Sequence, residues 1–153
     1  MAERSAGLML YRRGQGGLEV LLVHPGGPFW AKKDDGAWSI PKGIQGKGED
    51  APAAARREFE EETGLAPSGE LVALGEFRQP AGKIVSAYAV EGEFDPAALN
   101  SNRFSIEWPP RSGRMRDFPE VDRAAWFSPE EANRKLLRGQ VPILAALLSR
   151  LGS

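Results

Sequence analysis

A dense run of glutamates inside a predicted helix constrains this chain more than any other feature. The stretch GIQGKGEDAPAAARREFEEETGL, residues 43–65, contains five glutamates, and three of them are consecutive. Asp50 is a typical N-cap, Pro52 is tolerated in the first helical turn, and Gly64 stands where a C-terminal cap belongs. These signals predict a helix from about Asp50 to Thr63. Carboxylates that repel one another must therefore share one rigid element.

The predicted helix has two chemically different faces. Residues three and four positions apart share a face, so Glu58, Glu61 and Glu62 lie together. Alanines and Phe59 recur at four-residue spacing on another face, which favours burial against a sheet. A solvated, glutamate-rich surface helix is one interpretation. The other is a site for magnesium or manganese, because hard cations prefer carboxylate oxygens.

The residues around the glutamates decide between these interpretations. They fit the pattern G-x5-E-x7-R-E-U-x-E-E-x-G-U, in which U is a bulky apolar residue, at every fixed position. The matching residues are Gly43, Glu49, Arg57, Glu58, Phe59, Glu61, Glu62, Gly64 and Leu65. With this motif the chain resembles the Nudix hydrolases. The resemblance implies an α+β Nudix fold, a mixed β-sheet sandwiched between α-helices, as a single domain over residues 1–153.

The rest of the chain agrees with that order of elements. Strands are predicted at residues 5–13, 18–25, 37–41, 70–77, 83–92, 104–108 and 123–128. Helices are predicted at residues 128–139 and 141–151. Strands mixed with one central helix and two late helices, without regular β–α–β alternation, favour an α+β class. A chain of 153 residues is the usual length of one domain.

The resemblance also implies a metal site and a reaction. The implied ligands are the carboxylates of Glu58, Glu61 and Glu62 and the backbone carbonyl of Lys42. Arg57 is counted with the catalytic residues, and it is implied to pair with Glu49 and so to orient the helix and the preceding loop. The implied reaction cleaves a nucleoside diphosphate linked to a group X, by attack of a metal-activated water.

The base that deprotonates this water does not follow from the motif. It can be a glutamate of the helix or one on a loop outside it. Glu120, in the segment FPEVDRAAWF, is the candidate outside the motif, because several family members place such a residue there. Glu107 and Glu76 are rivals. The alternative for Glu120 is an ordinary solvated loop glutamate.

Two segments outside the motif carry candidates for substrate binding. In FWAKKDDGAWSIPKG, Trp38 or Trp30 is a candidate to stack on a base, and Lys32, Lys33 or Lys42 to contact phosphate. The alternative is that Trp38 lies in the core and that the KKDD run is a solvated, self-neutralising loop.

The second segment, WPPRSGRMRDFPE, is predicted to be a glycine-containing loop. It holds Arg111, Arg114 and Arg116, and guanidinium groups suit a polyphosphate substrate. A plain surface loop is the alternative. The single histidine, His24, is expected to be a bystander rather than a catalytic base.

Composition excludes several other functions. The chain has no cysteine, which excludes disulfides, thiolate zinc sites and a cysteine nucleophile, and with them an isoprenoid diphosphate isomerase of the same fold. A net charge of −1 gives no general attraction to nucleic acid or to a membrane. No apolar run approaches the roughly 20 residues of a membrane span, and the N-terminus lacks a signal peptide's apolar centre. We therefore expect a cytoplasmic monomer or homodimer.

The substrate is expected to be a small nucleotide. GAWSIPKG followed by the motif resembles the branches that act on oxidised dGTP and diadenosine tetraphosphate, which favours a nucleoside triphosphate or a dinucleoside polyphosphate. Pro80, shortly after the motif, resembles the ADP-ribose branch, so an ADP-ribose or nucleotide-sugar pyrophosphatase is an alternative. A non-catalytic nucleotide sensor is another, although such proteins typically lose motif carboxylates that this chain keeps. RNA 5′-end decapping has no support from the charge.

Overall fold

Two long antiparallel strands open the chain in this computed structural model, which describes residues 3–152. β1 (Arg4–Gly14) and β2 (Gly17–Pro25) are joined by a tight turn that places Gly14 opposite Gly17. Gly17 has a φ of 111°, a conformation that strains residues with a side chain. Most of β1 is buried on both of its faces, so its sequence is a nearly continuous apolar run instead of an alternating one.

β1 lies in the middle of a six-stranded mixed sheet. The other members are β2, β3 (Lys42–Ile44), β4 (Val72–Arg78), β5 (Ile84–Glu91) and β8 (Val121–Phe127). The strand order is β4-β5-β1-β2-β8, and β3 pairs with β1 outside this path. β1 is parallel to β5, with Leu8 opposite Tyr88, whereas the other pairs are antiparallel.

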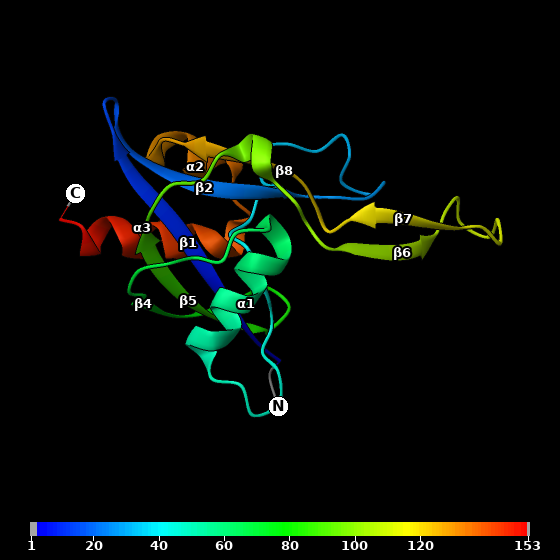
Figure 1. Cartoon of the computed structure of the whole chain (residues 1–153), viewed down its shortest axis with the longest axis horizontal. Coiled ribbons are helices and arrows are strands. Elements are labelled where there is room, and N and C mark those ends of the chain that lie inside the picture. The colour runs from blue at the N-terminus through cyan, green and yellow to red at the C-terminus, as the bar shows by residue number, and fades with distance from the viewer. Residues whose placement is uncertain (1–2, 153) are drawn as a thin grey trace.

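Helices cover both faces of this sheet (Figure 1). They are α1 (Ala51–Thr63), α2 (Pro129–Lys135) and α3 (Val141–Arg150). Neighbouring residues of a strand point to opposite faces. Leu8 therefore packs with Phe59 of α1 in one core, and Met9 packs with Ile143 of α3 in the other. This arrangement confirms the predicted α+β class with a mixed sheet between helices.

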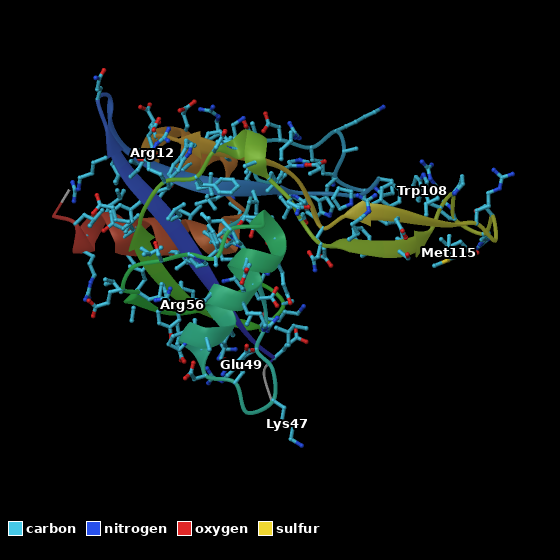
Figure 2. The ribbon with its side chains drawn as sticks, in the orientation of Figure 1. Arg12, Lys47, Glu49, Arg56, Trp108 and Met115 are labelled. Carbon is cyan, nitrogen blue, oxygen red and sulfur yellow. The ribbon has the colours of Figure 1, made fainter. Side chains whose placement is uncertain are left out.

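A two-stranded sheet of β6 (Arg103–Glu107) and β7 (Met115–Pro119) projects from the body (Figure 1). Residues 115–119 were expected to belong to a loop, and that expectation is wrong. They form a strand because they pair with β6, with Phe104 opposite Phe118. Trp108 and Met115 lie on this projecting hairpin (Figure 2).

Other boundaries also differ from the prediction. Residues 37–41 make only isolated bridges, because Ser39 pairs with Val23 on one side while Trp38 pairs with Leu136 on the other. The strand falls instead at β3, immediately afterwards. The helix expected over 128–139 ends at Lys135 and is followed by a short 3-10 helix, η2 (Arg138–Gln140). Another 3-10 helix, η1 (Pro96–Ala98), precedes β6. No helix within residues 3–152 has both the length and the apolar character needed to cross a membrane.

Candidate active site

The two ends of α1 are held by local hydrogen bonds. The Asp50 carboxylate accepts the backbone N–H of Ala53 at 2.9 Å, which satisfies one free donor of the first turn. Gly64 has a φ of 87° and donates its N–H to the carbonyl of Glu60 at 2.8 Å. These caps fix where the helix begins and ends, and thus which way each glutamate points.

β3 places the backbone of Gly43 directly against the carboxylate of Glu58. A Cβ atom added at Gly43 would lie 2.0 Å from Oε1 of Glu58, far inside contact distance. Glycine is therefore required here by close approach, since Gly43 itself does not have a positive φ. The contact brings the Lys42 backbone, which precedes Gly43 in β3, next to α1.

Arg57 joins the loop before α1 to the glutamates on it. Its Nε and Nη2 donate to the two carboxylate oxygens of Glu49 at 2.8 and 2.9 Å, a bidentate pair. Nη1 donates to Oε2 of Glu58 at 2.7 Å and to Oε2 of Glu61 at 3.2 Å. Nη2 also donates to the carbonyl of Ile44 at 3.1 Å. One guanidinium thus holds three carboxylates and the end of β3.

The electrostatics of this ion pair are visible in its two partners. Hydrogen bonds from Arg57, and then from the backbone of Gly46, lower the pKa of Glu49 to about 2. The hydrogen bonds that Arg57 donates to Glu49 also raise the pKa of Arg57 above its usual range. Glu49 and Arg57 therefore both remain charged near neutral pH.

Glu62 lies in a cleft of about 210 Å³ beside α1. Lys42, Glu120, Trp30 and Val121 also line this cleft. Burial raises the pKa of Glu62 to about 8, and repulsion from Glu58 and Glu120 adds to the effect. Burial likewise raises the pKa of Glu58, against the hydrogen bond from Arg57 that lowers it.

A larger cavity lies beyond the C-terminal end of α1. It has a volume of about 560 Å³, and Arg12, Leu65 and Trp126 are among its lining residues. No carboxylate of the motif lines it, so the smaller cleft at Glu62 is the candidate active site.

The motif carboxylates suit a hard cation by their chemistry. In this structure Glu58 and Glu61 accept hydrogen bonds from Arg57. Within residues 3–152, no three acidic or histidine side chains are grouped so as to hold a metal ion. However, the bond to Arg57 uses only Oε2 of Glu58. The pKa of Glu62 is raised first by burial and then by repulsion from Glu58 and Glu120, and a bound divalent cation would relieve that repulsion.

Of the two tryptophans proposed for base stacking, only Trp30 lines the cleft. Trp38 is 4% exposed and packs edge-to-face on Phe127 at 5.0 Å. Its indole N–H donates to Asp34 at 2.8 Å. The expectation that Trp38 stacks on a base is therefore corrected, because the core covers its ring.

The lysine–aspartate run before the motif pairs outside itself. Asp34 accepts from Lys135 of α2 at 2.7 Å, and Asp35 pairs with Arg134 at 3.3 Å. The interpretation of this run as self-neutralising is therefore wrong, because its aspartates pair with α2. Lys32 is exposed on this loop and does not line the cleft, whereas Lys42 does.

The arginines of WPPRSGRMRDFPE lie on the projecting hairpin. Arg111, with a φ of 63°, and Arg114 flank its tip, and neither lines the cleft. Within residues 3–152, neither arginine forms an ion pair. Their positive charge therefore faces solvent on the projecting hairpin, outside the active-site cleft.

Among the three glutamates outside the motif that were candidates for the base, only Glu120 lies in the cleft. Glu107 accepts the backbone N–H groups of Arg111 and Gly113 at the hairpin tip, and Glu76 pairs with Arg4 at 2.9 Å. Glu120 lies between β7 and β8, and backbone hydrogen bonds at its N–H and its carbonyl fix its position.

Ser39 also lines the cleft. No motif marks this residue, so no signal in the sequence indicated that it would lie there.

The family comparison agrees with this geometry. The family model described as the NUDIX domain matches residues 1–147. No curated protein sequence matches the chain.

Several solved structures are similar. An Ap4A hydrolase from C. elegans, in a binary complex, is 22% identical with a TM-score of 0.68, over 97% of this chain and 98% of that one. The NUDIX domain of Shewanella oneidensis NrtR, complexed with ADP ribose, is 18% identical with a TM-score of 0.68, over 99% and 89%. The C-terminal domain of mouse MUTYH, in complex with human PCNA, is 20% identical with a TM-score of 0.63, over 100% and 92%. At such identities the likeness shows the shared fold alone.

Proposed function

Because the chain belongs to the Nudix family of pyrophosphohydrolases, we propose that it hydrolyses a nucleotide pyrophosphate linkage with a divalent metal, in the cleft that Glu62 and Glu120 line. The observation that carries this proposal is the meeting of Glu62, Glu120 and Lys42 in one cleft, at the end of a helix that retains every motif carboxylate.

The metal is assigned to the motif residues. Glu58, Glu61, Glu62 and the Lys42 carbonyl would hold Mg²⁺ or Mn²⁺, since both ions prefer oxygen ligands. Such an ion supplies positive charge to phosphate oxygens and lowers the pKa of bound water. Arg57 keeps the side chain of Glu58 against α1, and Glu49 keeps Arg57 in place.

The other roles belong to the walls of the cleft. Glu120 is proposed to take the proton of the attacking water, since it is a carboxylate in the cleft that Arg57 does not bind. The Lys42 ammonium, whose charge acts on Glu62, is proposed to contact a substrate phosphate. Trp30 offers an aromatic wall for a base.

For the substrate we propose a nucleoside triphosphate or a dinucleoside polyphosphate. The support for this substrate class is the resemblance of GAWSIPKG and the motif to the branches that act on such nucleotides. Arg111 and Arg114 lie outside the cleft, so we assign them to the part of a polyphosphate that would extend beyond it. Lys32 is assigned to the same outer part of the substrate. Pro80, on which the ADP-ribose alternative rests, packs beside Gly139 of η2 and does not line the cleft, and the substrate panel decides this alternative.

A substrate panel with magnesium tests the proposal. Nucleoside triphosphates, dinucleoside polyphosphates and ADP-sugars are supplied, and phosphate, pyrophosphate and nucleotide products are separated. We expect cleavage of at least one polyphosphate, and loss of it in Glu62→Gln but not in the matched Glu60→Gln, since Glu60 is exposed and outside the motif's fixed positions. Tight binding without cleavage of any compound would instead establish a nucleotide sensor. Preferential cleavage of ADP-ribose would establish the nucleotide-sugar alternative.

A further inference from the structure

His24 of β2 is fully buried, and both of its ring nitrogens have partners. Nδ1 lies 2.8 Å from Oδ1 of Asp122, and Nε2 lies 2.7 Å from the carbonyl oxygen of Lys33. The ring also packs edge-to-face on Trp38, with centroids 5.2 Å apart. A buried imidazole with two short contacts has no freedom to turn, so these contacts define its chemical state.

A β-bulge directs Asp122 toward this ring. β2 and β8 pair with His24 opposite Arg123, but the next pair joins Pro25 to Val121. The register shift leaves Asp122 as the extra residue of β8. An extra residue in one strand re-aims a side chain, and here it brings a carboxylate to Nδ1 of a residue 98 positions away.

The two partners of His24 are both acceptors. A carbonyl oxygen cannot donate a proton, and an ionised carboxylate cannot either. A neutral imidazole has a single N–H, so it would leave one lone pair facing an oxygen in a fully buried position, which is unfavourable. With N–H groups on both nitrogens, each contact becomes a hydrogen bond. Two acceptors around one imidazole therefore favour the doubly protonated ring when Asp122 is ionised.

Asp122 is the negatively charged partner of the ring, because the other charged groups near it are paired elsewhere or screened by solvent. On the 26–36 loop, Asp34 and Asp35 are neutralised by Lys135 and Arg134 of α2. On β8, Arg123 lies 3.6 Å from Asp122 and opposes a positive ring, but its side chain is half exposed and is screened by solvent. Lys33 contributes its carbonyl to the ring, and its ammonium lies over Trp30 at 5.3 Å.

The contacts of His24 lie behind the walls of the active-site cleft. Its chain neighbours Val23 and Pro25 line the cleft, and Asp122 directly follows the lining residue Val121. The N–H of Lys33 donates to the carbonyl of Trp30 at 3.0 Å, so the carbonyl that His24 holds belongs to the turn that carries Trp30.

We propose that doubly protonated His24 is a positioning residue, which fastens the Trp30–Lys33 turn to the bulge of β8 and so holds Trp30 in the cleft with Glu62 and Glu120. His24 touches no substrate, and its effect falls on substrate binding. This effect rests on the proposed function, but the protonation state of the ring does not.

The protonation state can be measured directly, because His24 is the single histidine of the chain. Nitrogen-15 NMR of the metal-free protein with labelled histidine reports this ring alone. We expect two ring N–H signals at pH 7, both slow to exchange with water. A single N–H signal at pH 7 would overturn the proposal, since one of the two contacts would then not be donated by the ring.

The replacement Asp122→Asn tests the positioning role. The introduced amide can donate to Nδ1 of a neutral ring, whose Nε2–H still reaches the Lys33 carbonyl. Asp122→Asn should therefore keep the turn in place, whereas Asp122→Ala, which leaves Nδ1 of His24 without its partner, should loosen it. We expect KM to rise about tenfold in Asp122→Ala, the effect of one lost charge-assisted hydrogen bond, and to stay within about twofold of wild type in Asp122→Asn. The kcat values of both variants should change less than about twofold.

His24→Gln supplies the complementary variant, with a KM raised by a similar factor. If it fails to fold, the comparison of Asp122→Ala with Asp122→Asn still decides. A wild-type KM in Asp122→Ala would refute the positioning role while leaving hydrolysis intact. If no substrate is cleaved at all, the proposed function fails instead, and the nucleotide Kd replaces KM in the same comparison.

Discussion

Arg57 and Glu49 share two hydrogen bonds, from Nε to Oε2 at 2.8 Å and from Nη2 to Oε1 at 2.9 Å. The fork of the guanidinium matches the carboxylate, so this pair fixes an orientation as well as a distance. Through it the loop before α1 is tied to the helix residue that also bonds with Glu58. Figure 2 shows Glu49 where this loop meets the helix.

The first prediction concerns the pH dependence of this pair. The pKa of Glu49 is lowered from its ordinary value of 4.5 to about 2, chiefly by the hydrogen bonds from Arg57. A carboxylate with a lowered pKa stabilises the fold fully above about pH 4.5, and this stabilisation is lost as the pH falls toward 2. Glu49→Gln should therefore unfold at lower urea than wild type at pH 7, and the difference should shrink steadily below pH 4.5. A difference independent of pH would contradict the assignment.

The second prediction is that one motif carboxylate destabilises the metal-free fold. Burial, followed by repulsion from Glu58, raises the pKa of Glu62 to about 8. The unfolded chain releases this proton near pH 4.5, so the free energy of unfolding falls as pH rises from about 4.5 to about 8. In EDTA, Glu62→Gln should be more stable than wild type at pH 8 and equal to it at pH 4.

The same variant should lose activity. Removing groups that only support metal ligands typically costs about 10- to 100-fold, so loss of a ligand should cost at least as much. Glu60→Gln is the matched control, because Glu60 is exposed on the same helix. It should change neither the stability nor the rate. If Glu62→Gln is instead less stable than wild type at pH 8 in EDTA, the Glu62 carboxylate does not destabilise the metal-free fold.

Local signals predicted α1 correctly, because its caps and its apolar face lie within its own sequence. Asp50 and Gly64 act as the expected caps, and Phe59 is buried as its spacing indicated. The α+β class followed from the order of the elements, and the sheet between helices from the resemblance that the motif carries. These features depend on residues close in the chain, and they need no knowledge of distant contacts.

Features that depend on distant contacts could not be predicted. β7 is a strand only because β6 pairs with it, since its own sequence, MRDFP, has no alternating apolar pattern and ends in a proline. Trp38 was a candidate for stacking because its sequence does not show that Phe127 covers the ring. The contact of His24 with Asp122 requires a bulge that no local pattern indicates.

The third prediction follows from the close approach of Gly43 to Glu58. Gly43→Ala adds a methyl group where 2.0 Å separates the new atom from Oε1 of Glu58, so the carboxylate must move. Displacing a catalytic group by about 1 Å can cost about 100-fold in rate, and we expect kcat/KM to fall by that order. Gly16→Ala is the control, since nothing lies within 4 Å of its added Cβ atom. Full activity in Gly43→Ala would mean that Glu58 needs no fixed position.

The last prediction tests the general base. Glu120 lines the cleft with Glu62, whereas Glu107 is held by backbone N–H groups at the hairpin tip. General-base catalysis typically contributes about 10²- to 10⁴-fold, so Glu120→Gln should lower kcat within that range and leave KM nearly unchanged, because glutamine keeps the shape of the side chain. Glu107→Gln should retain wild-type kcat. The measurement is kcat and KM for the best substrate of the panel at saturating magnesium. If Glu120→Gln keeps its kcat, the proton passes to a glutamate of α1, and the assignment of Glu120 is wrong.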